Sequence, residues 1–558
     1  MNRSSPRDAK SDFPQGLDQG LWFVPLGGAG EIGMNLNLYA CDGQWMMVDL
    51  GVTFGDESIP GIDVVMADPS FIVERREKLA GLIVTHAHED HVGAVAHLWP
   101  QLKCPVYTTP FCAAFLEYKL KEAGLDGKVP VHIIPLGGHV DIGPFSVDFI
   151  TLTHSIPEPN ALAIRTKYGT IFHTGDWKFD PDPLIGSPTD FAALNAIGDE
   201  GVLALVGDST NVFSEGEAGS EGDVRESLIA LLGRYTGRIA VGCFASNLAR
   251  LESICRAAEA NGRHVALVGP SLWRIAETAR RTGYLSPDLT FYKAEDASFL
   301  PRDKVLYICT GSQGEARAAL MRIASGQHPD VTLEEGDVVI FSSRVIPGNE
   351  KAIAKVQNEL AKRNVQIVTT RDHFIHVSGH PARDELRRMY QMIRPKISIP
   401  VHGEAMHMRA HGELAKECQV PQTVLVENGK AVKFSKDGRA RVMGTVWSGR
   451  MAFEDGEVVP FSSPMLKDRK RMFYDGAVVA TISLDEDGEV CGDPQVAVLG
   501  MADPLEDDWA DRLDKAVSRL PRKARQDDTA VEEAVRSTIR KAFAPRRKPV
   551  VKVHIQRV

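Results

Sequence analysis

Three histidines and one aspartate lie within six residues in the segment "THAHEDHVGA", directly after the apolar run "GLIV". These side chains are His86, His88, Asp90 and His91. Neutral imidazoles and carboxylates are ligands that suit Zn²⁺ and Mn²⁺. Unrelated surface residues are a poor explanation, because ordering so many polar groups in one turn is costly unless something binds them. The segment therefore predicts a metal site, with His86 and His88 facing one ion and Asp90 and His91 a second.

One turn of chain cannot complete two coordination shells, so further ligands are expected where other strands end. His154 ends the run "FITLTH", Asp176 ends "TIFHTGD" and His402 ends "KISIPVH". Together with the first segment they give five histidines and two aspartates, enough for two ions bridged by Asp176 and a hydroxide. Paired ions about 3.5–4 Å apart convert water into a nucleophile and bind a phosphoryl oxygen. The expected ligands are His86, His88 and His154 for one ion, Asp90, His91 and His402 for the other, and Asp176 for both.

The elements that position these residues change along the chain. Short β-rich runs dominate residues 20–210, and several end in His or Asp, as is usual for a site at the carboxyl ends of strands. From about residue 237, strands and helices alternate, which predicts a parallel, doubly wound sheet in a separate domain. Residues 445–470 are turn-rich and charged, as in a linker, and the strands and helices after them predict a small α/β domain.

The HxHxDH motif followed by His, Asp and a distant His resembles the metallo-β-lactamase fold, a four-layer αββα sandwich. The 225 residues between Asp176 and His402 are too many for a plain member. An inserted α/β cap is similar to that of the β-CASP nucleases. Within that group the blocks "LGGAGEIGMN", "CFASN", "TGSQGE", "IPGNE" and "HVSGH" resemble the bacterial ribonuclease J family over residues 20–430.

This resemblance implies a division of the chain. We expect a disordered tail over residues 1–18 and a metallo-β-lactamase domain over 19–212, completed by 366–445. The β-CASP domain is expected over 213–365, a linker over 446–470 and a C-terminal α/β domain over 471–558. The resemblance also implies dimers or tetramers assembled with the help of the C-terminal domain.

Further site residues follow from the resemblance alone. It implies that His380 is the general acid, that Asp208 orients or charges it, and that Asp176 belongs to the catalytic unit. Asp208 also fits a turn or cap before "STNVF". The resemblance further implies a pocket for a 5′ phosphate of RNA and, in some members, a calcium ion. The expected pocket residues are Phe244, Ala245, Ser246, His376, Val377, Ser378, Gly379 and His380, and the expected calcium residues are Gly61, Asp63 and Asp468.

The expected phosphate pocket and the expected calcium site both contain residues with a purely structural alternative role. Ser246 is also a candidate N-cap for the helix "NLARLESIC", and the carboxylates of the calcium set are equally suited to surface turns.

The glycines Gly28, Gly30 and Gly33 form a GxGxxG string that, with Asp49, imitates a dinucleotide fingerprint. That fingerprint requires a helix after the last glycine, whereas "MNLNLYACDG" has a strand pattern. NAD is therefore rejected.

The length, net charge and cysteine content of the chain limit the classes of protein to which it can belong. The 558 residues require two to four domains, and the net charge of −10 leaves contact with a polyanion to local patches. The eight scattered cysteines predict buried thiols in a reducing compartment. The polar N-terminus is no signal peptide, and no apolar run approaches the ~18 residues of a membrane span. A cytoplasmic protein is expected, without a membrane partner.

The expected function is a two-metal ribonuclease acting in RNA decay and maturation, with Zn²⁺ or Mn²⁺ as cofactor and possible further RNA-decay proteins as partners. The resemblance implies that it acts 5′-to-3′ from 5′-monophosphate ends, with possible endonuclease activity. Alternatives are a DNA-processing β-CASP nuclease, in which the last metal position tends to be Val, a thioester or lactone hydrolase, and a catalytically inactive RNA-binding subunit. The cap domain disfavours the small-molecule hydrolase, and seven intact ligands disfavour the inactive subunit.

Overall fold

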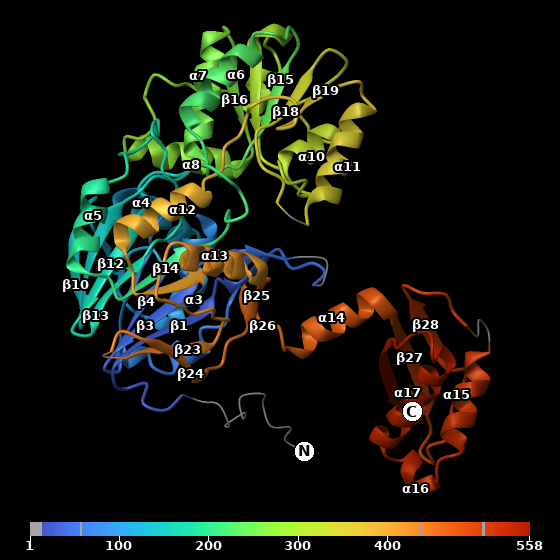
Figure 1. The fold of residues 1–558 in the computed structure, drawn as a ribbon. Helices are drawn as coiled ribbons and strands as arrows, with labels where there is room; N and C mark the ends of the chain where they lie inside the picture. Colours follow the sequence, from blue (N-terminus) through green and yellow to red (C-terminus); the bar gives the residue numbers. More distant parts are fainter. Residues whose placement is uncertain (1–13, 56–58, 347, 436, 505–507) are drawn as a thin grey trace. The chain divides into compact units, whose positions relative to one another are not determined.

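The computed structural model describes residues 14–55, 59–346, 348–435, 437–504 and 508–558, and its chain forms two compact units (Figure 1). The first unit runs to residue 53 and resumes over 66–449, and the second contains 54–65 and 450–558. Most of the predicted disordered tail, residues 1–13, lies outside the described residues. No helix in the described ranges is long and apolar enough to cross a bilayer.

An eight-stranded sheet forms one layer of the first unit, in the order β24-β23-β1-β3-β4-β7-β8-β9. The run "LWFVPLG" becomes β1 over the predicted residues, and all seven are buried, as expected for an apolar run without polar alternation. The strands are β1 (Leu21–Gly27), β3 (Leu36–Cys41), β4 (Gln44–Val48), β7 (Leu79–Ile83), β8 (Val106–Thr108), β9 (Val131–Ile133), β23 (Lys430–Phe434) and β24 (Ala440–Thr445). Helices α1 (Ser70–Val73), α3 (Val95–Leu102) and α4 (Pro110–Glu122) belong to this part of the chain.

A seven-stranded sheet packs against the first one, because side chains of both sheets, including Phe23 and Phe149, share one buried cluster. Its opposite face packs against α5, α12 and α13, whose Leu194, Met389 and Leu414 join Phe172 in a second cluster. The predicted αββα arrangement is thus confirmed. The strands, in sheet order, are β10 (His139–Ile142), β11 (Phe145–Thr151), β12 (Asn160–Thr166), β13 (Gly169–His173), β14 (Ala204–Asp208), β20 (Ile397–Val401) and β22 (Gln422–Thr423), and the helices are α5 (Phe191–Glu200), α12 (Arg383–Ile393) and α13 (Ala405–Glu417).

The inserted segment forms a five-stranded sheet in the order β16-β17-β15-β18-β19, and all its neighbouring strands are parallel. The predicted doubly wound sheet is therefore present. Its last strand lies beyond residue 365, the expected end of the domain. The elements are α6 (Glu221–Leu232), β15 (Ile239–Gly242), α7 (Leu248–Ala260), β16 (His264–Val268), α8 (Pro270–Arg281), α9 (Ala294–Ala297), β17 (Val305–Cys309), α10 (Ala319–Ala324), β18 (Val338–Phe341), α11 (Glu350–Ala361) and β19 (Gln366–Val368).

The second unit has its own core, in which Ile482, Leu513 and Val535 are fully buried. A three-stranded sheet of order β28-β27-β29 packs with two long helices. Its elements are α14 (Pro464–Asp475), β27 (Ala477–Leu484), β28 (Gln495–Leu499), α15 (Trp509–Ser518), α16 (Arg522–Arg525), α17 (Asp528–Phe543) and β29 (Val550–Arg557).

The segment 446–470, which was expected to be a linker, contains regular secondary structure. Strands β25 (Arg450–Glu454) and β26 (Glu457–Pro460) form an antiparallel hairpin there, and α14 begins at Pro464. The turn is Asp455–Gly456, and both residues have positive φ, as the two-residue hairpin turn requires. The Asp-Gly pair is the local signal that the linker interpretation overlooked.

The glycine-rich segment joins two antiparallel strands, β1 and β3. The strand predicted after Gly33 is present as β3, and between them lie Gly28 and the two-residue β2 (Ala29–Gly30). Gly28 has φ +82°, and its carbonyl accepts a hydrogen bond of 2.6 Å from the backbone N–H of His402. The segment thus helps to position a predicted metal ligand. The remaining short elements are β5 (Val52–Phe54), β6 (Val64–Ala67), α2 (Glu89–Val92) and β21 (Gly403–Glu404).

Candidate active site

The sheet topology brings several predicted site residues to one edge. Strands β13, β14 and β20 are parallel neighbours, so their carboxyl ends meet at the same edge of the sheet. Asp176 follows β13, Asp208 ends β14 and His402 follows β20. In the other sheet, β7 leads into the loop of His86 and His88 and then into α2.

The first group of candidate ligands is His86, His88, His154 and Asp176, whose ligand atoms all lie within 4.8 Å of one another. Nδ1 of His88 is 3.1 Å from Nε2 of His86 and 3.0 Å from Nε2 of His154. Oδ2 of Asp176 lies 4.0 and 3.9 Å from those two Nε2 atoms. All four donors therefore converge on one small volume, as the sequence predicted.

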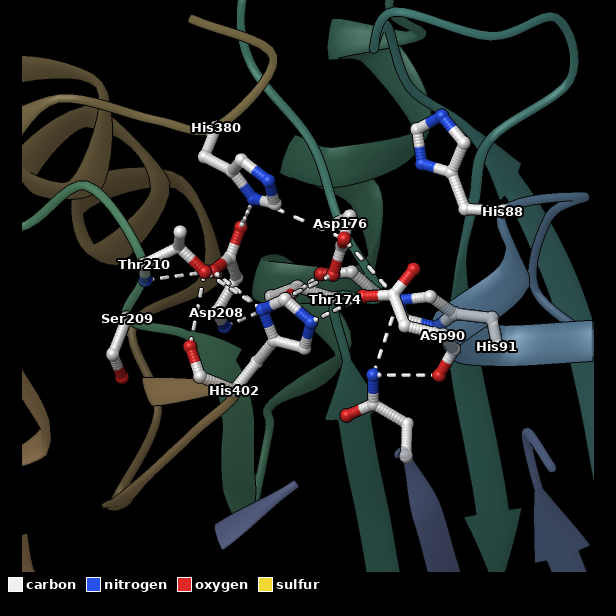
Figure 2. A network of polar contacts seen from close by, with 12 residues as sticks. His88, Asp90, His91, Thr174, Asp176, Asp208, Ser209, Thr210, His380 and His402 are labelled. Atoms are coloured by element: carbon white, nitrogen blue, oxygen red, sulfur yellow. Dashed lines mark hydrogen bonds and ion pairs between the residues drawn. The ribbon is translucent and has the colours of Figure 1, made fainter. Parts of the chain in front are cut away.

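The second group contains Asp90, His91, His402 and again Asp176 (Figure 2). Nε2 of His402 is 3.0 Å from Oδ2 of Asp90, and Nε2 of His91 is 3.2 Å from Oδ2 of Asp176. Oδ1 of Asp176 is buried and has no hydrogen-bond partner among the described residues. A carboxylate oxygen of this kind suits a cation, so the donor set fits a pair of divalent metal ions that share Asp176.

The ionisation of the first group, which contains His86, His88 and His154, suits metal binding. Burial lowers the pKa of His86 and His154 well below the ordinary value and that of His88 to about 4. These imidazoles are neutral at pH 7 and keep a lone pair for a ligand bond. Burial alone would raise the pKa of Asp176, but the neighbouring His402 and His91 keep it below the usual range. Asp176 is therefore a carboxylate in the folded protein.

Hydrogen bonds from residues other than the predicted metal ligands hold the imidazoles in place. Nδ1 of His91 lies 2.7 Å from Oδ2 of Asp49, Nδ1 of His402 lies 2.7 Å from Oγ1 of Thr210, and Nδ1 of His154 lies 2.5 Å from the carbonyl oxygen of Gly379. Such contacts leave Nε2 for a metal and fix the ring orientation. Asp49 and Thr210 were not predicted in this role, although Asp49 ends the strand-like run "WMMVDLG".

Two of these residues have unusual backbone conformations. Asp49 has φ +63° and His402 has φ +49°, and the left-handed region costs a non-glycine residue about 1–2 kcal/mol. Asp49 is also fully buried, and its carboxylate accepts hydrogen bonds from the N–H and hydroxyl of Thr85. The fold thus tolerates backbone strain at two positions that determine the geometry of the site.

We expect Asp49→Asn to weaken metal binding about 10- to 100-fold, because an outer partner of a ligating histidine has effects of that size. Asparagine is chosen because it tolerates positive φ better than most residues. Metal affinity is measured by competition with a chromogenic chelator. Asp337→Asn is the matched control, since Asp337 is equally buried but lies before β18 of the inserted sheet. Equal affinity in both variants would contradict the role of Asp49.

A histidine–aspartate pair lies beside the two groups. Nδ1 of His380 is 2.8 Å from Oδ2 of Asp208 and 3.9 Å from Oδ2 of Asp176. Burial lowers the pKa of His380, but Asp208 and Asp176 outweigh it and raise that pKa above its ordinary value. The Asp208 side chain is fully buried, whereas 22% of the His380 side chain is exposed. His380 is thus the member of the pair that a substrate can reach.

The predicted phosphate-pocket segments approach each other through a buried arginine. Nη1 of Arg250, in the first turn of α7, lies 3.0 Å from the carbonyl oxygen of Ile375 and 3.2 Å from Nδ1 of His376. The hydroxyl of Ser378 accepts a hydrogen bond from the N–H of His380. The alternative interpretation of Ser246 as N-cap is wrong, because Asn247 caps α7 by accepting from the N–H of Arg250. The remaining pocket residues, Phe244, Ala245, Val377 and Gly379, lie in the same two segments.

The possible calcium site gains no support from the described residues. Asp468 interacts with Arg471, and Gly61 has φ +77° and lies near Arg469. Among the described residues, the groups of three or more metal-binding side chains all lie at the site around Asp176. The calcium site, which also included Asp63, stays a prediction.

Four known family models match separate parts of the chain. The Beta-lactamase superfamily domain matches residues 60–198, and the Ribonuclease J, beta-CASP domain matches residues 236–360. The Zn-dependent metallo-hydrolase RNA specificity domain matches residues 364–424, which include His380 and His402. The Ribonuclease J C-terminal domain matches residues 464–558.

Similar proteins carry a common name. "Ribonuclease J" of Sinorhizobium meliloti is 42% identical over 99% of this chain and 100% of that protein. "Ribonuclease J" of Mycolicibacterium smegmatis is 37% identical over 95% and 96% of the two chains, and "Ribonuclease J 1" of Streptococcus pyogenes is 36% identical over 82% of each. A solved structure from Enterococcus faecalis, of unknown function, covers 74% of this chain and 100% of its own, with a TM-score of 0.51 and 16% identity. It shares the fold alone.

Proposed function

Because the chain belongs to the ribonuclease J family, we propose that it is a two-metal ribonuclease that hydrolyses phosphodiester bonds of RNA in RNA decay and maturation. The observation that supports this most is the arrangement of seven candidate ligands in two groups that share Asp176, with the pair His380–Asp208 beside them. An inactive RNA-binding subunit has no need for such an arrangement. The match to an RNA specificity domain favours RNA over DNA as substrate.

The ligand assignments follow the two groups. His86, His88 and His154 would hold one ion, Asp90, His91 and His402 the other, and Asp176 both. Bound Zn²⁺ or Mn²⁺ ions supply Lewis acidity, which lowers the pKa of a water and stabilises charge on phosphoryl oxygens. The protein contributes imidazoles whose orientation is fixed by Asp49, Thr210 and Gly379.

His380 supplies the proton that the leaving sugar oxygen needs. Burial lowers the pKa of His380, but Asp208 and Asp176 raise it above its ordinary value, which favours the protonated ring that a general acid needs. Asp208 accepts from Nδ1, which fixes the orientation of the ring and stabilises its charge, as a buried aspartate does for other catalytic histidines. The proton is then donated from Nε2, the ring nitrogen that Asp208 does not engage.

We further propose that residues 244–246 and 376–380 bind a 5′ phosphate and that the enzyme acts 5′-to-3′ from monophosphorylated ends, with possible endonuclease activity. Backbone N–H groups and the hydroxyls of Ser246 and Ser378 suit a phosphate. Arg250 holds the two segments together, while its charge is paired with the buried carboxylate of Glu221.

The proposed function predicts different rates on one RNA sequence with three different 5′ ends. The RNA carries a 3′ label and a 5′ monophosphate, triphosphate or hydroxyl, and products are separated by length over time. The monophosphorylated RNA is expected to shorten one nucleotide at a time and fastest of the three. Equal rates for all three ends would contradict the pocket, and hydrolysis of DNA but not RNA would contradict the function.

The oligomeric state and cellular location belong to the same proposal. A homodimer or homotetramer assembled through the C-terminal unit is supported by the exposed apolar side chains of α14, including Phe473 and Tyr474. A reducing, cytoplasmic location is supported by eight free cysteines, six of which are buried. Other RNA-decay proteins are possible partners.

A further inference from the structure

A large exposed aromatic side chain lies on the loop that carries Asp208. Phe213 is five residues after Asp208, and 51% of its surface is exposed. Its ring packs on His407 of α13, with 5.2 Å between the ring centroids. His407 is itself five residues after His402. Phe213 is therefore fixed between two segments that each begin with a residue of the candidate active site.

The side-chain amide of Asn211, two residues before Phe213, holds the guanidinium group of Arg344. Nη1 of Arg344, in the loop after β18, donates a hydrogen bond of 2.6 Å to Oδ1 of Asn211. Nδ2 of Asn211 in turn donates to the carbonyl oxygen of His380, at 3.3 Å. A single side chain thus links the guanidinium group to the backbone of the proposed general acid.

The charge of Arg344 is not neutralised by a neighbouring acid. Its hydrogen-bond partner is the neutral amide of Asn211, and among the described residues no carboxylate forms an ion pair with it within 4.0 Å. Burial lowers the pKa of His376 well below its ordinary value, and the charges of Arg250 and then Arg344 lower it further. Arg344 therefore lies within electrostatic range of the proposed phosphate pocket.

We propose that Phe213 and Arg344 form a nucleotide subsite at the mouth of the active site, in which an RNA base stacks on Phe213 and Arg344 binds an RNA phosphate. This inference rests on the proposed ribonuclease function. Single exposed apolar side chains are common and need no explanation. Phe213 differs because it is fixed on His407, belongs to the Asp208 loop and lies beside a segment that holds an unneutralised arginine. Val345 and Ile346, next to Arg344, are exposed as well and add apolar surface.

The subsite predicts how RNA affinity responds to changes in Phe213. Stacking of a base on an aromatic side chain is worth about 1–3 kcal/mol, so Phe213→Ala is expected to raise the Kd about 5- to 150-fold, whereas Phe213→Tyr retains affinity within a factor of about two. Binding of the metal-loaded protein to phosphorothioate RNA, which is hydrolysed slowly, is measured by fluorescence anisotropy. Phe299→Ala is the matched control, because Phe299 is exposed but precedes β17 at the opposite end of the inserted sheet.

The role of Arg344 predicts a change in salt dependence. One lost phosphate contact on a single strand lowers the slope of log K against log salt by about 0.7. Arg344→Gln is expected to show this reduced slope, and Arg344→Lys to retain most of the wild-type slope. Arg234→Gln, before β15, is the control with an unchanged slope. An unchanged slope in Arg344→Gln would overturn the phosphate contact.

Abasic RNA separates stacking from a structural effect. The wild-type protein is expected to lose affinity for RNA that lacks one particular base near the scissile bond, by the same factor that Phe213→Ala loses for intact RNA. The Phe213→Ala variant should bind that abasic RNA with the same affinity as it binds intact RNA. If the wild type hydrolyses RNA but tolerates every abasic position, the subsite is wrong and the proposed function stands. If the wild type neither binds nor hydrolyses RNA, the proposed function itself fails.

Discussion

Replacing Asp176 with alanine is expected to abolish RNA hydrolysis and to reduce the metal content of the protein. Asp176 belongs to both groups of candidate ligands, and its Oδ1 atom has no hydrogen-bond partner among the described residues. Removing one member of a catalytic unit typically costs about 10⁴-fold or more in rate. Turnover is measured on 5′-monophosphorylated RNA, and bound metal by mass spectrometry of the native protein and by elemental analysis.

The variant must be shown to fold. Asp176→Asn keeps the shape of the side chain but loses its charge, and it is expected to fail in the same way. Asp337→Asn should keep both full metal content and activity. A fully active Asp176→Ala protein with two bound ions would show that the assignment of Asp176 to both ions is wrong.

Replacing His380 with alanine is expected to lower kcat far more than RNA affinity. General acid catalysis is worth about 10²- to 10⁴-fold, and His380 is assigned to the proton and not to either ion. Metal content should therefore stay complete. Asp208→Asn should affect the same step, and its effect should combine non-additively with that of His380→Ala, since Nδ1 of His380 and Oδ2 of Asp208 are only 2.8 Å apart.

An activated substrate tests the same role chemically. A phosphodiester with a leaving group that needs no proton should restore much of the rate lost in His380→Ala. The other possibility is that His380 mainly binds phosphate. In His380→Ala, KM would then rise, kcat would stay unchanged and the activated substrate would restore no activity. This result would refute the general-acid role of His380 while leaving the ribonuclease proposal intact.

The candidate ligands could be predicted because their signals are local. The HxHxDH segment is continuous, and His154, Asp176 and His402 each follow an apolar run that the structure forms as a strand. Residues that depend on pairing between distant segments could not be predicted in this way. Asp49 reaches His91 because β4 and β7 are parallel neighbours with Val48 opposite Ile83, and nothing in either strand alone indicates that pairing.

The layers of the first unit and the parallel inserted sheet were also predicted correctly from apolar patterns. The prediction was wrong at the hairpin β25–β26, where charged residues suggested a linker and the Asp455–Gly456 turn was overlooked. Residues 54–65 group with the second unit, which a local pattern cannot reveal because their neighbours come much later in the chain. The contact of Phe213 with His407 likewise depends on packing between the Asp208 loop and α13.

The most direct test of the two-metal assignment is a titration of activity against bound metal. The protein is freed of metal with a chelator, and Zn²⁺ or Mn²⁺ is added back in measured amounts while hydrolysis of 5′-monophosphorylated RNA is followed. A two-metal site predicts no activity without metal and full activity only when two ions are bound per chain. Full activity in the chelated protein, or a maximum at one ion per chain, would contradict it.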